Sequence, residues 1–290
     1  MTPDDVVVAD GLRKVFRLTT KDGHEDFVAV EGASFTVRAG ECLAIVGESG
    51  SGKSTIARMI AGLETVTSGR VLVEGIERPP LPWSRARRLE LSRQVQMVFQ
   101  DPNSSLDPNQ TIAASLDEVL RIHFPDTTPP QRRERVAELL EQVGLDSRHG
   151  DMRPRWMSGG EKQRAAIARA LAVRPRLLIL DEAVSALDVS VQAHVLNLLT
   201  GLRRELGLTY LFISHDLGVV RQVSDTAIVM RRGQVVEEGT TTGILDNPRS
   251  DYTRSLLEAI PRPGWKPRRR AVRAHQDEAP PAELEEPVLA

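Results

Sequence analysis

Short apolar segments bounded by glycine and other turn residues predict the strands of a buried sheet. Buried parallel strands are nearly continuous in hydrophobic residues, because both faces of such a sheet are covered. Four segments predict strands of this sheet: residues 42–46, 94–99, 177–180 and 209–213. Residues 28–30 and 33–37 predict antiparallel strands near the N-terminus, and residues 226–230 and 234–238 predict a closing hairpin.

Helical periodicity marks the stretches between these strands. Apolar residues at i, i+3, i+4 and i+7, followed by Gly144, predict a helix over residues 131–143. Residues 189–206 predict a longer helix that Asp188 caps. Turn residues and helical patterns alternate over residues 102–172. We therefore expect an α/β core with an inserted helical subdomain.

Composition narrows the class of protein without identifying it. The chain has 290 residues, of which 40% are hydrophobic and 27% charged, as in ordinary globular proteins. A net charge of -2 predicts no general affinity for nucleic acid. The single cysteine, Cys42, cannot form an internal disulfide, which fits a reducing compartment. No segment has the length of a membrane span or the pattern of a signal peptide, so any work at a membrane is expected to be peripheral.

The most specific motif lies between a predicted strand and a predicted helix. It matches G-x-x-x-x-G-K-[ST] and comprises Gly47, Glu48, Ser49, Gly50, Ser51, Gly52, Lys53, Ser54 and Thr55. Small residues let backbone N–H groups converge on an anion, and the following helix directs its positive end there. Lys53 is expected to reach the β- and γ-phosphates of a nucleotide, and Ser54 to bind Mg²⁺. A flexible glycine-serine loop is the alternative, which the strand and helix on either side disfavour.

Two acids and a histidine follow strands of the same predicted sheet. Asp181 and Glu182 end the segment 177–180, and His215 comes shortly after 209–213. Parallel strands bring their carboxyl ends to one edge, where open α/β sheets bind ligands. There Asp181 would hold Mg²⁺, and Glu182 would orient or deprotonate the attacking water. A surface Asp-Glu pair and an incidental histidine are the structural alternatives.

Two further sites have a structural and a functional interpretation. Ser158 and Glu161 satisfy a capping box at the start of a helix, which accounts for them structurally. The intervening Gly159 and Gly160 leave bare amides at that helix N-terminus, as an anion site does. Phe16 is either a core side chain of a small sheet or a flat surface on which adenine stacks.

Together these motifs, in this order, resemble the ATP-binding cassette proteins, the nucleotide-binding subunits of ABC transporters. The resemblance covers about residues 6–262 and implies a P-loop NTPase core of the RecA type, with an antiparallel β subdomain and the inserted helical subdomain. It implies ATP and Mg²⁺ as ligands. Its site residues would be the nine motif residues 47–55, with Phe16, Gln100, Ser158, Gly159, Gly160, Asp181, Glu182, Asp188 and His215.

The resemblance also implies a role for each of these positions. Gln100 would sense the γ-phosphate, contribute to the Mg²⁺ site and couple to the membrane partner, while His215 would contact the γ-phosphate. Ser158, Gly159 and Gly160 would serve the nucleotide of the opposite subunit, and Asp188 would lie in the loop that crosses the dimer interface. The family signature usually has leucine and glutamine where this chain has Met157 and Glu161. Methionine keeps the apolar volume, and a helix N-terminus tolerates a glutamate.

A narrower resemblance concerns the cargo. Residues 100–108 and 251–261 are similar to the dipeptide, oligopeptide and nickel importer branch. We expect an ATPase domain over residues 6–262, including a branch-type segment at about 246–262, and a disordered tail over 263–290. No cysteine lies beyond Cys42, so the iron–sulfur cluster of some branch members is not expected.

The resemblance implies an importer ATPase for di- or oligopeptides at the cytoplasmic face of the bacterial inner membrane. Its partners would be a second cassette subunit, identical or different, two integral-membrane permease subunits and, indirectly, an extracytoplasmic substrate-binding protein. A nickel or sugar importer of the same branch is one alternative. Others are a soluble ABC ATPase of DNA repair or translation, which usually has a coiled coil or a second cassette, and a binding module without hydrolysis.

Overall fold

A six-stranded sheet forms the centre of the molecule. The computed structural model describes residues 4–20, 23–78 and 83–259. The strand order is β10-β9-β3-β8-β7-β6. Neighbouring strands from β9 to β6 are parallel, and β10 is antiparallel to β9. The strands are β3 (Cys42–Val46), β6 (Val95–Val98), β7 (Leu177–Asp181), β8 (Thr209–Ile213), β9 (Thr226–Arg231) and β10 (Gln234–Thr240).

The two faces of this sheet carry two separate hydrophobic cores. Every residue of β3, β7 and β8 is buried. In β3, Ala44 and Val46 belong to one core, whereas Leu43 and Ile45 belong to the other. Alternation with a period of two sends neighbouring side chains to opposite faces, so a continuous apolar run results when both faces are covered. The buried strands predicted at 42–46, 177–180 and 209–213 are thereby confirmed. The strand predicted at 94–99 forms β6, whose middle residues Gln96 and Met97 are only partly buried.

A second, antiparallel sheet lies on one side of the first, with the order β2-β1-β4-β5. Its strands are β1 (Asp5–Thr20), β2 (Gly23–Arg38), β4 (Ser68–Val73) and β5 (Ile76–Glu77). The prediction of separate strands at 28–30 and 33–37 is wrong, because both lie in β2. Gly32 has a φ of +70° within this strand. A glycine in this conformation accommodates a local irregularity without ending the strand.

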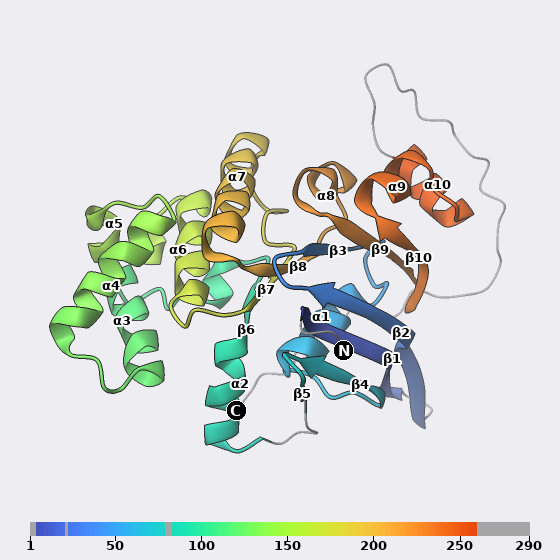
Figure 1. The fold of residues 1–290 in the computed structure, drawn as a ribbon, viewed down its shortest axis with the longest axis horizontal. Coiled ribbons are helices and arrows are strands. Elements are labelled where there is room, and N and C mark those ends of the chain that lie inside the picture. The colour runs from blue at the N-terminus through green and yellow to red at the C-terminus, as the bar shows by residue number, and fades with distance from the viewer. Residues whose placement is uncertain (1–3, 21–22, 79–82, 260–290) are drawn as a thin grey trace.

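Helices cover both faces of the central sheet (Figure 1). α1 (Lys53–Ala61) packs into the core shared with the antiparallel sheet, through Ile56 and Ile60. The opposite core takes residues from α6 (Gly159–Leu171) and α7 (Val189–Leu206), and α7 has the predicted bounds. The remaining described helices near the sheets are α2 (Arg85–Gln94), α8 (Leu217–Val223) and α9 (Thr241–Asp246).

The inserted helical subdomain is confirmed between β6 and β7. It contains α3 (Ile112–His123), α4 (Pro129–Gln142), α5 (Ser147–Asp151) and α6, with short 3₁₀ turns at Pro102–Ser104 and Pro154–Trp156. In Figure 1, α3, α4 and α5 lie on one side of the molecule, and β1 and β2 on the other. The helix predicted at 131–143 spans residues 129–142, because Thr128 and Gln131 form a capping box around its first turn.

The hydrophobic core extends past residue 245. α10 (Asp251–Glu258) follows α9, and its Tyr252 is 9% exposed and belongs to the main core. Residues 260–262 and the tail 263–290 lie outside the described residues. Within the described part of the chain, none of the helices combines the length and hydropathy that a membrane crossing requires.

Candidate nucleotide site

The phosphate loop runs from the end of β3 to the start of α1, as expected. Two of its glycines lie where a side chain would collide with backbone. A Cβ on Gly47 would lie 2.2 Å from the Met230 carbonyl oxygen, and one on Gly52 would lie 2.4 Å from the Ala29 carbonyl oxygen. Gly52 has a φ of +100°, which glycine adopts readily. The loop is thus wedged between β9 and β2, and its shape requires glycine at both ends.

Lys53 lies within the loop rather than in solvent. Its Nζ donates to the carbonyl oxygens of Gly47, at 2.9 Å, and Glu48, at 2.8 Å. Burial lowers the pKa of Lys53, while the charges of nearby carboxylates oppose this shift. Ser51 Oγ is also buried and has no hydrogen-bond partner in the described part of the chain. The loop therefore presents one cation and one unused hydroxyl.

Ser54 and Asp181 meet across the sheet edge. Ser54 Oγ donates to Asp181 Oδ1 at 3.0 Å, although 127 residues separate them in the chain. Asp181 is the last residue of β7 and is 8% exposed. Burial raises the pKa of this carboxyl, and the Ser54 hydrogen bond partly opposes the rise. Two oxygen donors thus lie together where a divalent cation could bind.

Glu182 and His215 form the next pair along the same edge. His215 Nδ1 lies 3.3 Å from Glu182 Oε2. The Glu182 backbone N–H donates to the Ile213 carbonyl at 3.0 Å, which joins the ends of β7 and β8. Glu182 has a φ of +49°, which is uncommon for a residue with a side chain and costs about 1–3 kcal/mol. The ends of β7 and β8 hold the strained backbone of Glu182, and with it the carboxylate, in place.

The positions of Gln100 and Phe16 relative to the site follow from strand pairing and not from a contact with the other site residues. Val98 pairs with Leu180, so Gln100, two residues on, leaves the sheet at the edge where Asp181 and Glu182 emerge, and it is exposed. Phe16 is half-buried on β1, with Lys14 Nζ 4.8 Å from its ring centroid. Its cross-strand partner Phe27 lies on the strand that the phosphate loop touches.

The signature residues lie at a different surface, where α6 and α7 begin. Ser158 caps α6, and its N–H donates to Glu161 Oε2 at 2.7 Å. That backbone hydrogen bond, with the Ser158 hydroxyl, holds the pKa of Glu161 below its ordinary value. Asp188 caps α7 by accepting from the backbone N–H groups of Ser190 and Val191, at 3.1 and 3.0 Å. Both predicted caps are confirmed.

Gly160 brings these two helix starts into contact. A Cβ there would lie 2.3 Å from Val191 Cγ1, whereas one on Gly159 would meet Leu187 at an ordinary 3.6 Å. Met157 is buried, as an apolar replacement for leucine should be. Gly160 therefore has a packing role in addition to its suggested role at an anion site.

Two contacts near these sites were not predicted from the sequence. His149 bridges α5 and α6, with Nδ1 2.8 Å from Asp146 Oδ1 and Nε2 3.3 Å from Glu161 Oε1. Tyr252 of α10 accepts a hydrogen bond from Glu48 of the phosphate loop, across 204 residues of chain. The His149–Glu161 and Tyr252–Glu48 contacts have no local sequence signal, because each joins separate elements.

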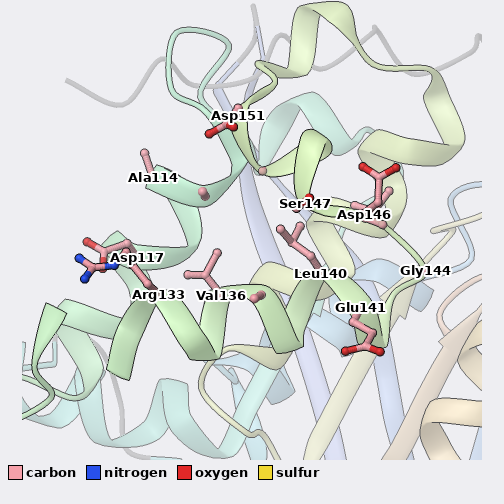
Figure 2. A pocket seen from close by; sticks show the side chains of 14 residues that line it. Ala114, Asp117, Arg133, Val136, Leu140, Glu141, Gly144, Asp146, Ser147 and Asp151 are labelled. Atoms are coloured by element: carbon pink, nitrogen blue, oxygen red, sulfur yellow. The ribbon is translucent and has the colours of Figure 1, made fainter. Parts of the chain in front are cut away.

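A cavity of about 970 Å³ lies elsewhere, in the helical subdomain. Figure 2 shows Val136 and Leu140 of α4 beside it, with Asp117 and Arg133 towards one end. None of the predicted site residues lines it. The phosphate loop, Gln100, Asp181, Glu182 and His215 instead lie at the carboxyl edge of the sheet.

The described residues contain no group of three or more His, Cys, Asp and Glu side chains suited to a metal ion. Mg²⁺ commonly takes only one or two protein oxygens and completes its shell with water and substrate phosphates. The pair Ser54 and Asp181 fits that pattern.

A phosphate loop at the carboxyl edge of a parallel sheet, with helices on both faces, defines a P-loop nucleotide-binding protein. Among protein families, the one described as ABC transporter matches residues 30–185. The oligopeptide transport ATP-binding protein OppF of Bacillus subtilis is 48% identical over 249 residues, covering 86% of this chain and 81% of that protein. AmiF of Streptococcus pneumoniae, also an oligopeptide transport ATP-binding protein, is 44% identical with the same coverage.

A longer relative and a solved structure agree with this assignment. The glutathione import ATP-binding protein GsiA of Salmonella choleraesuis is 46% identical over 85% of this chain and 38% of its own length. The dimeric ATP-binding cassette MJ0796, bound to ADP and Pi, matches with a TM-score of 0.71 at 29% identity, over 81% of this chain and 98% of that one. The chain belongs to the ABC transporter family as one of its ATP-binding, ATP-hydrolysing subunits.

Proposed function

We propose that this ATPase powers an importer of oligopeptides, with residues 6–262 as its ATPase domain. The observation that carries the site assignment is the convergence of Lys53, the Ser54–Asp181 pair and the Glu182–His215 pair on one sheet edge. Three strand ends contribute to this edge, so it forms only in the folded chain.

Each residue then has a chemical task. On binding ATP, Lys53 exchanges its loop carbonyls for β- and γ-phosphate oxygens, and the backbone N–H groups of the loop and of α1 complete the cradle. Glu182 orients a water towards the γ-phosphorus and accepts its proton as the bond to ADP breaks. His215 holds the Glu182 carboxylate and contacts the γ-phosphate, and Phe16 stacks on adenine. Gln100 senses the γ-phosphate and transmits its state to the permease.

Mg²⁺ is the metal that the donor set favours. Ser54 and Asp181 would hold it, with Gln100 as a third oxygen ligand from the same edge. Bound there, the ion would neutralise charge on the β- and γ-phosphates.

The second half of the site is proposed to come from another copy or a homologous subunit. Among the described residues, the two most exposed large apolar side chains are Val189, at 82%, and Trp156, at 69%. Both lie at the joined starts of α7 and α6, beside Asp188, Ser158 and the signature glycines. Exposed apolar groups next to these two helix N-termini fit a surface that a partner covers. Head-to-tail pairing would place each signature loop over the ATP of the other subunit.

The relatives support the peptide cargo and the cellular setting. Two of them are named as oligopeptide transport proteins and one as a glutathione import protein. We infer that the dimer docks on two permease subunits at the cytoplasmic face of the membrane, and that a substrate-binding protein delivers peptide from the other side. ATP closes the dimer and hydrolysis reopens it, because the closed state binds the γ-phosphate more tightly than the open state does.

The test of the hydrolytic role is Glu182→Gln. This variant keeps shape and hydrogen bonding but cannot accept a proton, so turnover should fall about 10²–10⁴-fold while ATP binding persists. Phosphate release and equilibrium binding measure the two effects. Glu205→Gln, an exposed carboxylate near the end of α7, is the matched control and should keep full activity. Normal turnover in Glu182→Gln would show that Glu182 is not the catalytic base.

The test of cargo uses the same variant as a trap. Affinity purification of Glu182→Gln with ATP from detergent-treated membranes should recover two multi-span permeases. Cells lacking the wild-type gene should regain uptake of labelled tri- to pentapeptides when given wild-type protein, but not when given the variant. Restored uptake of nickel without peptide, or recovery of soluble partners alone, would overturn the peptide-importer assignment.

A further inference from the structure

The branch-type segment at α10 contacts the nucleotide loop, although the nucleotide site does not otherwise involve it. The Glu48 backbone N–H donates to Tyr252 Oη at 3.4 Å, towards the long end of hydrogen-bond distances. Glu48 also accepts from Lys53 Nζ through its carbonyl. One residue of the phosphate loop is therefore fixed from two sides, by α10 through its N–H and by the phosphate-binding lysine through its carbonyl.

Tyr252 is itself held firmly enough to act as an anchor. Its side chain is buried against the main core, and the Arg231 guanidinium lies 4.8 Å from its ring centroid. Burial raises the pKa of Tyr252, so its hydroxyl stays protonated and neutral at physiological pH. A neutral phenol can accept the Glu48 hydrogen bond with one lone pair.

The start of α10 is fixed to the sheet by a buried carboxylate. Glu237 of β10 is 9% exposed and accepts from the backbone N–H groups of Arg249, at 2.8 Å, and Ser250, at 3.1 Å. Ser250 then caps α10 by accepting from the Tyr252 N–H at 3.2 Å. The β9–β10 edge of the sheet, where α10 follows α9 (Figure 1), thus sets the position of the tyrosine.

The same edge supports the first residue of the loop. The Met230 carbonyl of β9 lies so close to Gly47 that a Cβ there would be 2.2 Å away. Met230 precedes Arg231, which lies over the Tyr252 ring. Gly47 and Glu48 therefore rest on β9 and α10 respectively, and both supports belong to one packed unit.

We propose that Tyr252 is a positioning residue for ATP binding: α10 braces the phosphate loop at Glu48 and thereby holds Lys53 and the loop amides in the arrangement that receives phosphate. The proposal rests on ATP binding at residues 47–55. It gives α10 of the branch-type segment a role at the nucleotide site, so changes in α10 should alter the affinity for ATP.

The test is Tyr252→Phe, which removes one hydroxyl and keeps the ring under Arg231. Binding of Mg-ATP is measured by calorimetry in the Glu182→Gln background, where hydrolysis does not interfere. Losing the brace should weaken binding about two- to tenfold, the range for one lost hydrogen bond. In the hydrolysing enzyme, KM for ATP should rise by the same factor while kcat changes less than twofold. Hydrogen exchange of a peptide spanning residues 47–55 should quicken in the nucleotide-free protein.

Arg254→Ala is the matched control, because Arg254 is a surface residue of α10 that bonds Arg249 and Asp251 and not the loop. It should leave the Kd and the loop exchange unchanged. Equal effects in both variants would mean a general weakening of α10 and would overturn the proposal. An unchanged Kd in Tyr252→Phe would also overturn the proposal. So would a lower Kd, because the hydroxyl would then hold the loop away from phosphate. If the folded Glu182→Gln parent bound no ATP, the nucleotide site itself would be the failed assignment.

Discussion

At the scale of single residues, Asp181 carries a buried charge that lowers the stability of the ligand-free protein but serves the proposed Mg²⁺ site. Its carboxyl is buried at the end of β7, and burial raises its pKa above the ordinary 3.8. Between the ordinary pKa of the unfolded chain and the raised pKa of the folded chain, the folded chain binds more protons than the unfolded chain. The free energy of unfolding therefore falls as pH rises through that window. At neutral pH the charged carboxylate is therefore a net cost to the ligand-free protein.

Asp181→Asn should consequently stabilise the protein and inactivate it. The amide oxygen can still accept from Ser54, and the desolvated charge is gone. We expect a gain of about 1 kcal/mol, hence about 2–4 °C in Tm, at pH 7 in EDTA. Hydrolysis supported by Mg²⁺ should fall to background. A lower Tm for the variant would show that the charge is better compensated than its burial indicates.

At the scale of elements, local patterns in the sequence predicted the strands and helices. Contacts between residues far apart in the sequence were not predicted. The buried strands and α7 follow from apolar runs and from the Asp188 cap, which are local signals. β2 was divided wrongly at Gly32, because a glycine that allows a bulge looks the same in sequence as one that ends a strand. The sequence placed Asp181 and His215 on one edge because parallel strands share their direction. It could not give the Ser54–Asp181 contact or the Tyr252 brace, which depend on side-chain reach.

The contact between α6 and α7 gives a prediction at this scale. Gly160→Ala would bring a methyl group within 2.3 Å of Val191 Cγ1, so either Val191 must leave its rotamer or the two helices must separate. Overpacking of this kind costs about 1–3 kcal/mol, and Tm should fall accordingly. The double variant with Val191→Ala removes the obstructing methyl groups and should recover most of the loss.

Gly159→Ala is the control for this packing argument. Its Cβ would meet Leu187 at 3.6 Å, an ordinary contact, so Tm should stay close to that of the wild type. Its ATPase activity should nevertheless fall, since Gly159 is proposed to face the nucleotide of the other subunit. Equal losses of Tm in both glycine variants would count against the role of Val191.

At the scale of the whole molecule, the proposed mechanism gives one copy two half-sites that face different nucleotides. The phosphate loop, Asp181 and Glu182 lie at the carboxyl edge of the sheet, while the signature residues cap α6. Trp156 stands two residues before Ser158, largely exposed, with the Arg155 guanidinium 5.3 Å from its ring centroid. A partner that covered this surface would change the surroundings of the indole, so Trp156 would report the proposed dimer closure.

The chain has three tryptophans, so the Trp156 signal is isolated by difference. In Glu182→Gln protein, Mg-ATP should change the emission, and the change should vanish when Trp156→Phe is added. If the partner is a second copy, the ATP concentration at half-change should rise as the protein is diluted. Lys53→Ala, which should weaken ATP binding, should abolish the response. A change that survives Trp156→Phe, or one independent of protein concentration, would place the ATP-driven movement within a single copy and remove the shared site from the mechanism.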